Sequence, residues 1–254
     1  MDGKKLKPIY RVIRGLVALF YPKIEIVGTE NLPDGPCVVV ANHAQMNGPI
    51  TAELYFPGKR AIWCAAEMME FKEVAHYAFT DFWSFKPRWV QPFYRLLSHL
   101  IAPISVIVFN NAHTIPVHRD ARIMSTFRET IAALEDGASV IIFPERNAKH
   151  NHVVYDFQEG FVDVARLYRH KTGRDLCFVP AYITPKLRKM VIGAPVRCDP
   201  ANKLDAERRR VCDRLMDDIT RLAVELPPHT IVPYRNIPRR EYPSNRPQNG
   251  ERSA

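Results

Sequence analysis

Cysteine is scarce in this sequence, and the cysteines that are present are not arranged in pairs. Only 5 of the 254 residues are cysteine, and their spacing matches neither a disulfide framework nor a zinc-binding motif. They are Cys37, Cys64, Cys177, Cys198 and Cys212. We therefore expect reduced thiols in a cytosolic compartment. Internal repeats are also missing, so we expect one domain instead of a repeat array.

Signatures of nucleic-acid binding, secretion and metal binding are missing as well. No helix-turn-helix, zinc-finger or RNA-binding pattern is found, and His150 and His152 are too few for a zinc site. No small-residue cleavage site precedes Tyr21, so we expect no signal peptide. Charge is unbalanced, because 36 Lys and Arg against 27 Asp and Glu give +9 at pH 7. This excess favours an anionic membrane surface as partner, and nucleic acid, which rests on charge alone, is not expected.

Residues 1–23 combine positive charge with a helical apolar stripe. Between residues 9 and 21, apolar side chains recur every three or four positions. They are Ile9, Val12, Ile13, Leu16, Val17 and Phe20. The opposite face carries Arg11 and Arg14, and Lys4, Lys5 and Lys7 lie beside it. This pattern predicts an N-terminal amphipathic helix that either lies in a membrane interface or packs on the protein's own core.

A second apolar stretch, residues 92–109, lies inside an aromatic and apolar helical insertion that we place at about residues 65–110. It is as long as a short transmembrane span, but it holds Arg95, His99 and Pro103, so we do not expect it to cross a bilayer. Just before it, Trp83, Phe85 and Trp89 are mixed with basic residues, as is typical of a membrane boundary. The stretch therefore contacts a membrane surface or covers the core or an acyl pocket, and the two roles are compatible.

The remainder, residues 24–226, alternates between strand and helix patterns and predicts a single-domain α/β sandwich with a mixed sheet flanked by helices. Strands are expected at residues 24–27, 37–41, 115–117, 139–143, 176–183 and 190–192. Helices are expected at residues 157–169 and 203–225, and another between a capping box at Thr126 and Glu129 and a stop at Gly137. Residues 227–254 are rich in proline and arginine, which predicts an extended or disordered tail.

Four segments, three of which follow or contain a predicted strand, carry residues suited to chemistry. They are Asn42-His43-Ala44-Gln45-Met46-Asn47-Gly48, Ile115-Pro116-Val117-His118-Arg119, Phe143-Pro144-Glu145-Arg146-Asn147-Ala148 and Val179-Pro180-Ala181-Tyr182. In this order and spacing they resemble the blocks of the glycerolipid acyltransferase superfamily, of the 1-acylglycerol-3-phosphate acyltransferase type. Phe157-Gln158-Glu159-Gly160 stands where that family has a stretch with lysine and glycine. The resemblance covers roughly residues 24–225 and implies an acyltransferase-like fold.

The resemblance implies transfer of a fatty acyl group from acyl-CoA or acyl-carrier protein to a lysophospholipid or glycerol-phosphate acceptor. Such a protein would serve phospholipid biosynthesis at the cytoplasmic face of a membrane, as a peripheral or monotopic protein without a bound cofactor. Acyl transfer needs a base near the acceptor hydroxyl, and His43 suits this because histidine titrates near neutral pH. Arg119 would bind the acceptor's phosphate, with a surface ion pair to Asp120 or another nearby acid as the alternative. Pro144, Glu145 and Arg146 complete the substrate-binding set.

The sequence departs from the family's pattern where its chemistry is concentrated. Gly48 replaces the aspartate that would orient the histidine. Either Asn47 accepts the imidazole's hydrogen bond, or a carboxylate does, with Glu53, Glu67 and Asp81 as candidates. Arg146 stands where the family has a glycine, and Ala148 stands where it has an arginine. Either the positive charge still binds an anion in an altered geometry, or the pocket fits a different acceptor. The alternative function is a catalytically silent lipid- or acyl-binding protein that retains the fold.

Overall fold

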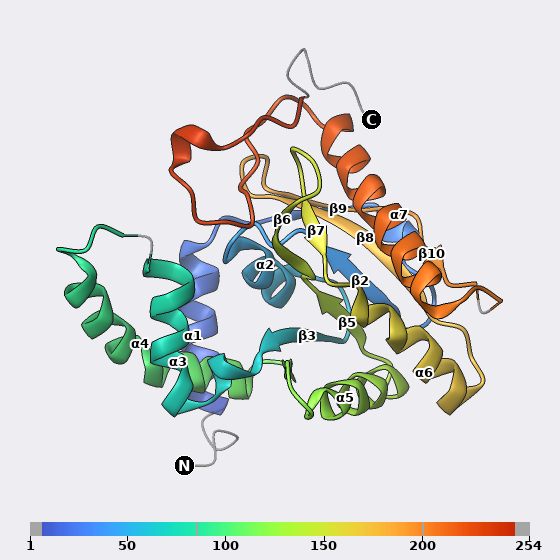
Figure 1. Ribbon diagram of the computed structural model, residues 1–254, viewed down its shortest axis with the longest axis horizontal. Helices are drawn as coiled ribbons and strands as arrows, with labels where there is room; N and C mark the ends of the chain where they lie inside the picture. Colours follow the sequence, from blue (N-terminus) through green and yellow to red (C-terminus); the bar gives the residue numbers. More distant parts are fainter. Residues whose placement is uncertain (1–6, 85, 200, 247–254) are drawn as a thin grey trace. The chain divides into compact units, whose positions relative to one another are not determined.

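The computed structural model describes residues 7–84, 86–199 and 201–246, which divide between two compact units (Figure 1). The sheet unit takes in residues 23–61 and those from 129 onward, and the helical unit takes in those up to 22 and 62–128. Both contain strands and helices, which confirms the predicted α/β class. The predicted N-terminal helix and the predicted insertion fall together in the helical unit. Lys4, Lys5, Phe85 and residues 247–254 lie outside the described residues.

A mixed sheet forms the centre of the sheet unit, with strands in the order β1-β9-β8-β2-β5 and β10 paired to β8. The strands are β1 (Glu25–Val27), β2 (Val38–Ala41), β5 (Ser139–Ile142), β8 (Cys177–Thr184), β9 (Lys189–Ile192) and β10 (Val196–Arg197). β2 runs parallel to both β5 and β8, so the carboxyl ends of these three strands meet at one edge. All four residues of β2 are buried, as a central parallel strand requires.

The α-helices that lie wholly within the sheet unit are α2 (Asn47–Tyr55), α6 (Asp163–Thr172) and α7 (Leu204–Glu225), and α7 packs along β8 (Figure 1). The helix predicted at residues 157–169 is present as α6, which ends at Thr172 before Gly173, but its predicted start at Phe157 was wrong. Phe157 ends a hairpin of β6 (Glu145–Lys149) and β7 (Tyr155–Phe157), and the 3-10 helix η5 (Glu159–Val162) separates β7 from α6. Tyr155 and Phe157 are buried with the less buried Asp156 between them, which is the period of a strand.

Helices dominate the other unit, around the parallel pair β3 (Arg60–Ala65) and β4 (Thr114–Val117). They are α1 (Lys7–Phe20), η3 (Ala66–Met69), α3 (Phe71–Ala78), the π-helix η4 (Phe79–Trp83) and α4 (Gln91–Asn111). Met68, Val74, Ala75 and Ala102 form their common core. The region from about residue 65 to 110 therefore contains the helices η3, α3, η4 and α4.

The apolar faces of α1 and α4 are largely uncovered within the helical unit. The two helices lie side by side, yet Tyr10 is the buried residue of α1, and Leu19 and Phe20 are 73% and 82% exposed. On α4, Phe93, Leu96, Leu100 and Ile104 are exposed. Among the described residues, α4 is the one helix whose length and composition would allow it to span a bilayer, and one such helix is weak evidence for a span.

Helix α5 (Ile123–Glu135) begins before the predicted capping box. Thr126 lies inside the helix, where its hydroxyl donates to the carbonyl of Pro116 at 2.7 Å and accepts from the N–H of His118 at 3.2 Å. The predicted capping box is therefore wrong, because this threonine ties α5 to β4 instead of capping its own helix. The predicted stop holds, since Gly137 adopts a φ of 78° just after the helix.

Residues 227–246, called the C-terminal loop here, are extended but firmly attached to the sheet unit. Asn245 is fully buried, and its amide donates to the carbonyl of Ala223 at 2.8 Å and accepts from the N–H of His229 at 2.8 Å. His229 in turn bonds Tyr182 on β8. The predicted tail therefore lacks long regular elements, but through Arg246 it is not disordered, because buried polar residues hold its two ends together.

Candidate active site

Asn42 fixes the start of the candidate site at the carboxyl end of β2. Its side chain is 2% exposed and forms two hydrogen bonds with the main chain of Ile183 on β8. The amide Nδ2 donates to the carbonyl at 3.0 Å, and Oδ1 accepts from the N–H at 2.7 Å. Asn42 therefore holds the chain to the neighbouring strand, immediately before His43.

A tight turn folds back onto the imidazole of His43. Ala44 and Gln45 have φ angles of 44° and 56°, a left-handed conformation that costs free energy for residues other than glycine. The turn directs the carbonyl of Gln45 at Nδ1 of His43, with which it forms a short hydrogen bond. A carbonyl oxygen can only accept, so Nδ1 carries the proton, and in the neutral imidazole Nε2 then carries the lone pair. This is the tautomer that a general base acting through Nε2 requires.

The orienting bond that the sequence assigned to Asn47 or to a carboxylate is therefore made by the main chain. Asn47 donates its amide to the carbonyl of Ala44 at 2.9 Å and so supports the turn. Glu53 pairs with Arg60 at 3.3 Å, and Glu67 and Asp81 belong to the helical unit. A main-chain carbonyl leaves no mark in the sequence, which is why the residue types alone could not identify it.

Gly48 lies where the resembling family has its aspartate, at the start of α2. A β-carbon there would lie 2.5 Å from the carbonyl oxygen of His43, 2.8 Å from the ring of Phe143 and 3.1 Å from the carbonyl oxygen of Asn42. The N–H of Gly48 also donates to the carbonyl of His43 at 3.0 Å. Main chain and an aromatic ring therefore fill the space that an aspartate side chain would need.

Glu145 joins the two loops of the site from a buried position. The carboxyl is 3% exposed, and its oxygens accept from the N–H of His43 at 2.5 Å and the N–H of Tyr155 at 3.0 Å. Burial raises the pKa of Glu145 to about 7, although both N–H groups act in the opposite direction. Glu145 thus belongs to the framework of the site instead of the substrate surface, which is where the sequence had placed it. Pro144 beside it is buried too.

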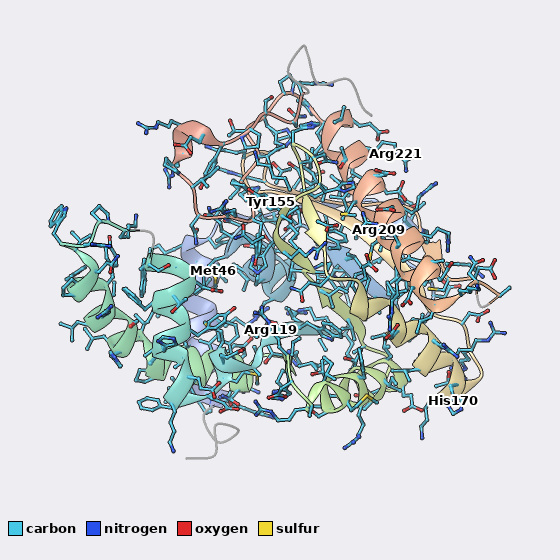
Figure 2. The ribbon with its side chains drawn as sticks, in the orientation of Figure 1. Met46, Arg119, Tyr155, His170, Arg209 and Arg221 are labelled. Carbon is cyan, nitrogen blue, oxygen red and sulfur yellow. The ribbon has the colours of Figure 1, made fainter. Side chains whose placement is uncertain are left out.

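Aromatic rings surround the imidazole, and one of them comes from the C-terminal loop. The ring centroid of Phe143 lies 5.3 Å from that of His43, and the centroid of Tyr234 lies 5.8 Å away in an edge-on arrangement. The ring centroid of Tyr155, which is labelled in Figure 2, lies 5.7 Å from that of Tyr234. Sequence reasoning missed Tyr234 because it lies in the segment that was predicted to be an extended or disordered tail.

Arg146 lies on the exposed side of the β6-β7 hairpin and forms an ion pair with Asp156. Arg209, which reaches the hairpin from α7 (labelled in Figure 2), bonds the other oxygen of Asp156 at 3.2 Å. Burial raises the pKa of Asp156, but the two arginines together lower it by more than burial raises it. The pKa of this carboxyl is therefore below its ordinary value. The charge that the sequence offered for anion binding at Arg146 is therefore already balanced within the protein.

Arg119 lies in the helical unit, in the exposed segment that follows β4. Asp120, the alternative partner predicted for it, bonds Arg122 instead, at 2.9 Å. Burial raises the pKa of Tyr77, the neighbouring Asp81 raises it further, and the charge of Arg119 lowers it. Within the sheet unit the structure brings together His43, Asn47, Pro144 and Glu145, whereas Arg119 belongs to the other unit.

No family model matches this chain, and no curated protein matches it significantly. Among solved structures, the chain is similar to the 1-acyl-sn-glycerophosphate acyltransferase PlsC from Thermotoga maritima, at 17% identity and a TM-score of 0.44. That match covers 87% of this chain and 79% of the other. A likeness this distant assigns no function, so a function must be inferred from the residues themselves.

Proposed function

We propose that this protein transfers a fatty acyl group from a thioester, acyl-CoA or acyl-carrier protein, to the hydroxyl of a lysophospholipid or glycerol-phosphate acceptor. The proposal is supported by the four sequence blocks and above all by one observation, the bond from Nδ1 of His43 to the carbonyl of Gln45. That bond sets the tautomer in which Nε2 can act as general base.

The reaction follows from this arrangement. Nε2 of His43 removes the proton of the acceptor hydroxyl while the oxygen attacks the thioester carbonyl carbon. The new ester bond forms, the carbon-sulfur bond breaks, and the imidazolium returns the proton to the leaving thiolate. The Gln45 carbonyl keeps the ring oriented throughout, but as a neutral dipole it stabilises the imidazolium less than an aspartate would. We therefore expect measurable but slow turnover.

Acceptor binding is the part of the proposal that starts from the sequence resemblance. Arg119 is the proposed phosphate ligand, since its guanidinium is exposed and Asp120 is engaged by Arg122. Arg146 is a weaker choice, because a phosphate would have to compete with Asp156 for it. Substitution of a phosphate ligand weakens acceptor binding, so Arg119→Gln should raise the KM for acceptor more than it lowers kcat.

Membrane association of the helical unit is the remaining part of the proposal. The uncovered apolar residues of α1 and α4 would enter the interface of an anionic membrane, with Arg11 and Arg14 of α1 near the headgroups. This arrangement makes the protein peripheral or monotopic at the cytoplasmic face. It would also bring the acceptor, itself a lipid, to the enzyme.

Transfer of a labelled acyl group tests the proposal directly. Purified protein is mixed with anionic vesicles, labelled acyl-CoA or acyl-carrier protein, and a panel of lysophospholipids and glycerol phosphate. Wild type should form labelled ester, and His43→Ala should lose at least about a hundredfold in rate, as expected for loss of a general base. His170→Ala, on the exposed end of α6 (labelled in Figure 2), should retain full activity. No transfer to any acceptor, or an active His43→Ala, would contradict the mechanism.

A catalytically silent acyl-binding protein is the second candidate, and the closed space at Gly48 favours it. No side chain at that position can supply the charge that stabilises an imidazolium. Binding of acyl-CoA to wild type without any ester formation, at every acceptor tested, would support this candidate over the first.

A further inference from the structure

The C-terminal loop closes back on the turn that orients His43. Its two ends are joined by a bridge between Thr230 and Ser244 and by a bond from the N–H of Ile231 to the carbonyl of Pro243 at 2.9 Å. The fully buried Asn245 anchors both ends to the carboxyl end of α7. The residues between these anchors form a compact loop with closely spaced ends, and this loop contacts the turn that contains Gln45.

Gln45 is the residue on which the loop acts. Its side-chain amide Nε2 donates to the hydroxyl of Tyr242 at 2.9 Å and more weakly to the carbonyl of Arg235 at 3.4 Å. An amide has two N–H donors, so both bonds can form at once. The main-chain carbonyl of the same residue accepts the bond from Nδ1 of His43. The side chain of Gln45 therefore faces the loop, and its main chain faces the imidazole.

This double engagement explains how a strained turn is kept in place. Successive left-handed residues that are not glycine persist only when their surroundings over-determine them. Within the turn, the amide of Asn47 bonds the carbonyl of Ala44. From outside the turn, Tyr242 and Arg235 hold the side chain of Gln45. The loop adds a third contact through Tyr234, whose ring meets the imidazole edge-on.

We propose that Tyr242 is a positioning residue, which acts through Gln45 to hold His43 in the Nδ1-protonated tautomer. The C-terminal loop then takes over the orienting task that an aspartate at position 48 would perform in the resembling family. The proposal deepens the proposed function, on which its kinetic part rests, but the tautomer itself can be measured without any turnover.

Two substitutions remove the two ends of the same hydrogen bond. Tyr242→Phe removes the hydroxyl, and Gln45→Met removes the amide at nearly equal side-chain length. Nitrogen-15 NMR of labelled histidine, with His43→Ala to assign the signals, reports which ring nitrogen carries the proton. Wild type should show a protonated Nδ1, and both variants should show a mixture of tautomers. Tyr168→Phe on α6 makes the same chemical change elsewhere in the sheet unit and should leave the His43 signals unchanged.

Kinetics provide the second measurement. Loss of one neutral hydrogen bond should lower kcat about fivefold in each single variant, with KM changed less than about twofold. The double variant should lose no more than Gln45→Met alone, instead of the product of the two losses, because Gln45→Met already removes the bond that Tyr242→Phe breaks, together with the weaker bond to Arg235.

The outcomes separate the two proposals. A wild type without turnover overturns the proposed function, and a tautomer mixture that develops in Tyr242→Phe and Gln45→Met supports the positioning role in either case. An unchanged Nδ1-protonated signal in both variants overturns the positioning role, as does a double variant whose kcat falls by the full product.

Discussion

Gly48 and His43 are packed main chain against main chain: a β-carbon at position 48 would lie 2.5 Å from the carbonyl oxygen of His43. The glycine is therefore required by the local geometry. The left-handed turn at Ala44 and Gln45 draws α2 close to the end of β2, and the same turn supplies the carbonyl that bonds the imidazole. The missing aspartate and the main-chain acceptor are thus two consequences of one turn.

Gly48→Asp should destabilise the protein without activating it. The new side chain would overlap two main-chain carbonyls and the ring of Phe143, and overpacking of this kind costs about 1–3 kcal/mol. The turn would have to move, which would withdraw the Gln45 carbonyl from the imidazole. Urea unfolding should show the loss of stability, and acyl transfer should fall.

Gly35→Asp is the matched control, because nothing lies within 4 Å of a β-carbon at that position in the same unit. It should leave stability and activity nearly unchanged. Higher turnover in Gly48→Asp than in wild type would show instead that the turn at Ala44 and Gln45 can rearrange to accept a carboxylate.

Asn42→Ala should be among the most damaging single changes in the sheet unit. It leaves the N–H and the carbonyl of Ile183 without their partner at a buried position, which costs about 2–4 kcal/mol in unfolding free energy. Asn31→Ala is a milder control, since Asn31 donates one partly buried bond to the carbonyl of Ile192 and should cost about 1 kcal/mol. Chemical denaturation compares the two, and equal losses would argue against a special role for Asn42.

Glu145 should make stability depend on pH in the opposite sense to an ordinary carboxylate. Burial raises its pKa from 4.5 to about 7, so the folded protein binds this proton more tightly than the unfolded chain does. The stabilisation is fully present below pH 4.5 and is lost as pH rises through 7. The difference between these values corresponds to at most about 3 kcal/mol.

The comparison with Glu145→Gln measures this dependence. The unfolding free energy of wild type minus that of Glu145→Gln should fall between pH 4.5 and 7 and stay level above. Glu135→Gln, at an exposed carboxylate near the end of α5, should show no such trend. A difference that rises with pH over this range would mean that the two N–H donors outweigh burial and keep Glu145 ionised.

The parts of the site that follow from strand ends could be predicted from the sequence. β2 and β5 are parallel, with Val38 paired to Val140 and Val40 to Ile142. The segments that follow them, Asn42-His43 and Pro144-Glu145, therefore begin at the same edge of the sheet. The apolar runs alone indicate this much. They do not indicate that the buried carboxyl of Glu145 bonds the main chain of His43, because a glutamate in a loop after a strand can equally face solvent.

The rest of the site depends on features that residue types do not encode. Ala44 and Gln45 are ordinary residues whose left-handed conformation is imposed by tertiary contacts. The acceptor for His43 is a carbonyl, which every residue has. The C-terminal loop has the composition of a disordered tail, and a single buried asparagine, Asn245, supplies much of the anchoring that makes it part of the fold.

The helical unit should bind anionic vesicles through the apolar residues it leaves exposed. Phe20 and Trp89 are 82% and 83% exposed, so Phe20→Glu and Trp89→Glu remove little packing from the folded protein. Burial of one such side chain in a membrane interface contributes about 1.5–3 kcal/mol, so each change should weaken vesicle binding by at least about tenfold.

Met124→Glu, at a residue of α5 that is 55% exposed, introduces the same charge in the same unit and should have little effect. Vesicle sedimentation with equal amounts of each protein makes the comparison, with circular dichroism to show that folding is retained. If all three variants bind like wild type, the exposed residues of α1 and of the segment before α4 have another role. If all three are weakened equally, net charge controls binding instead of these apolar residues.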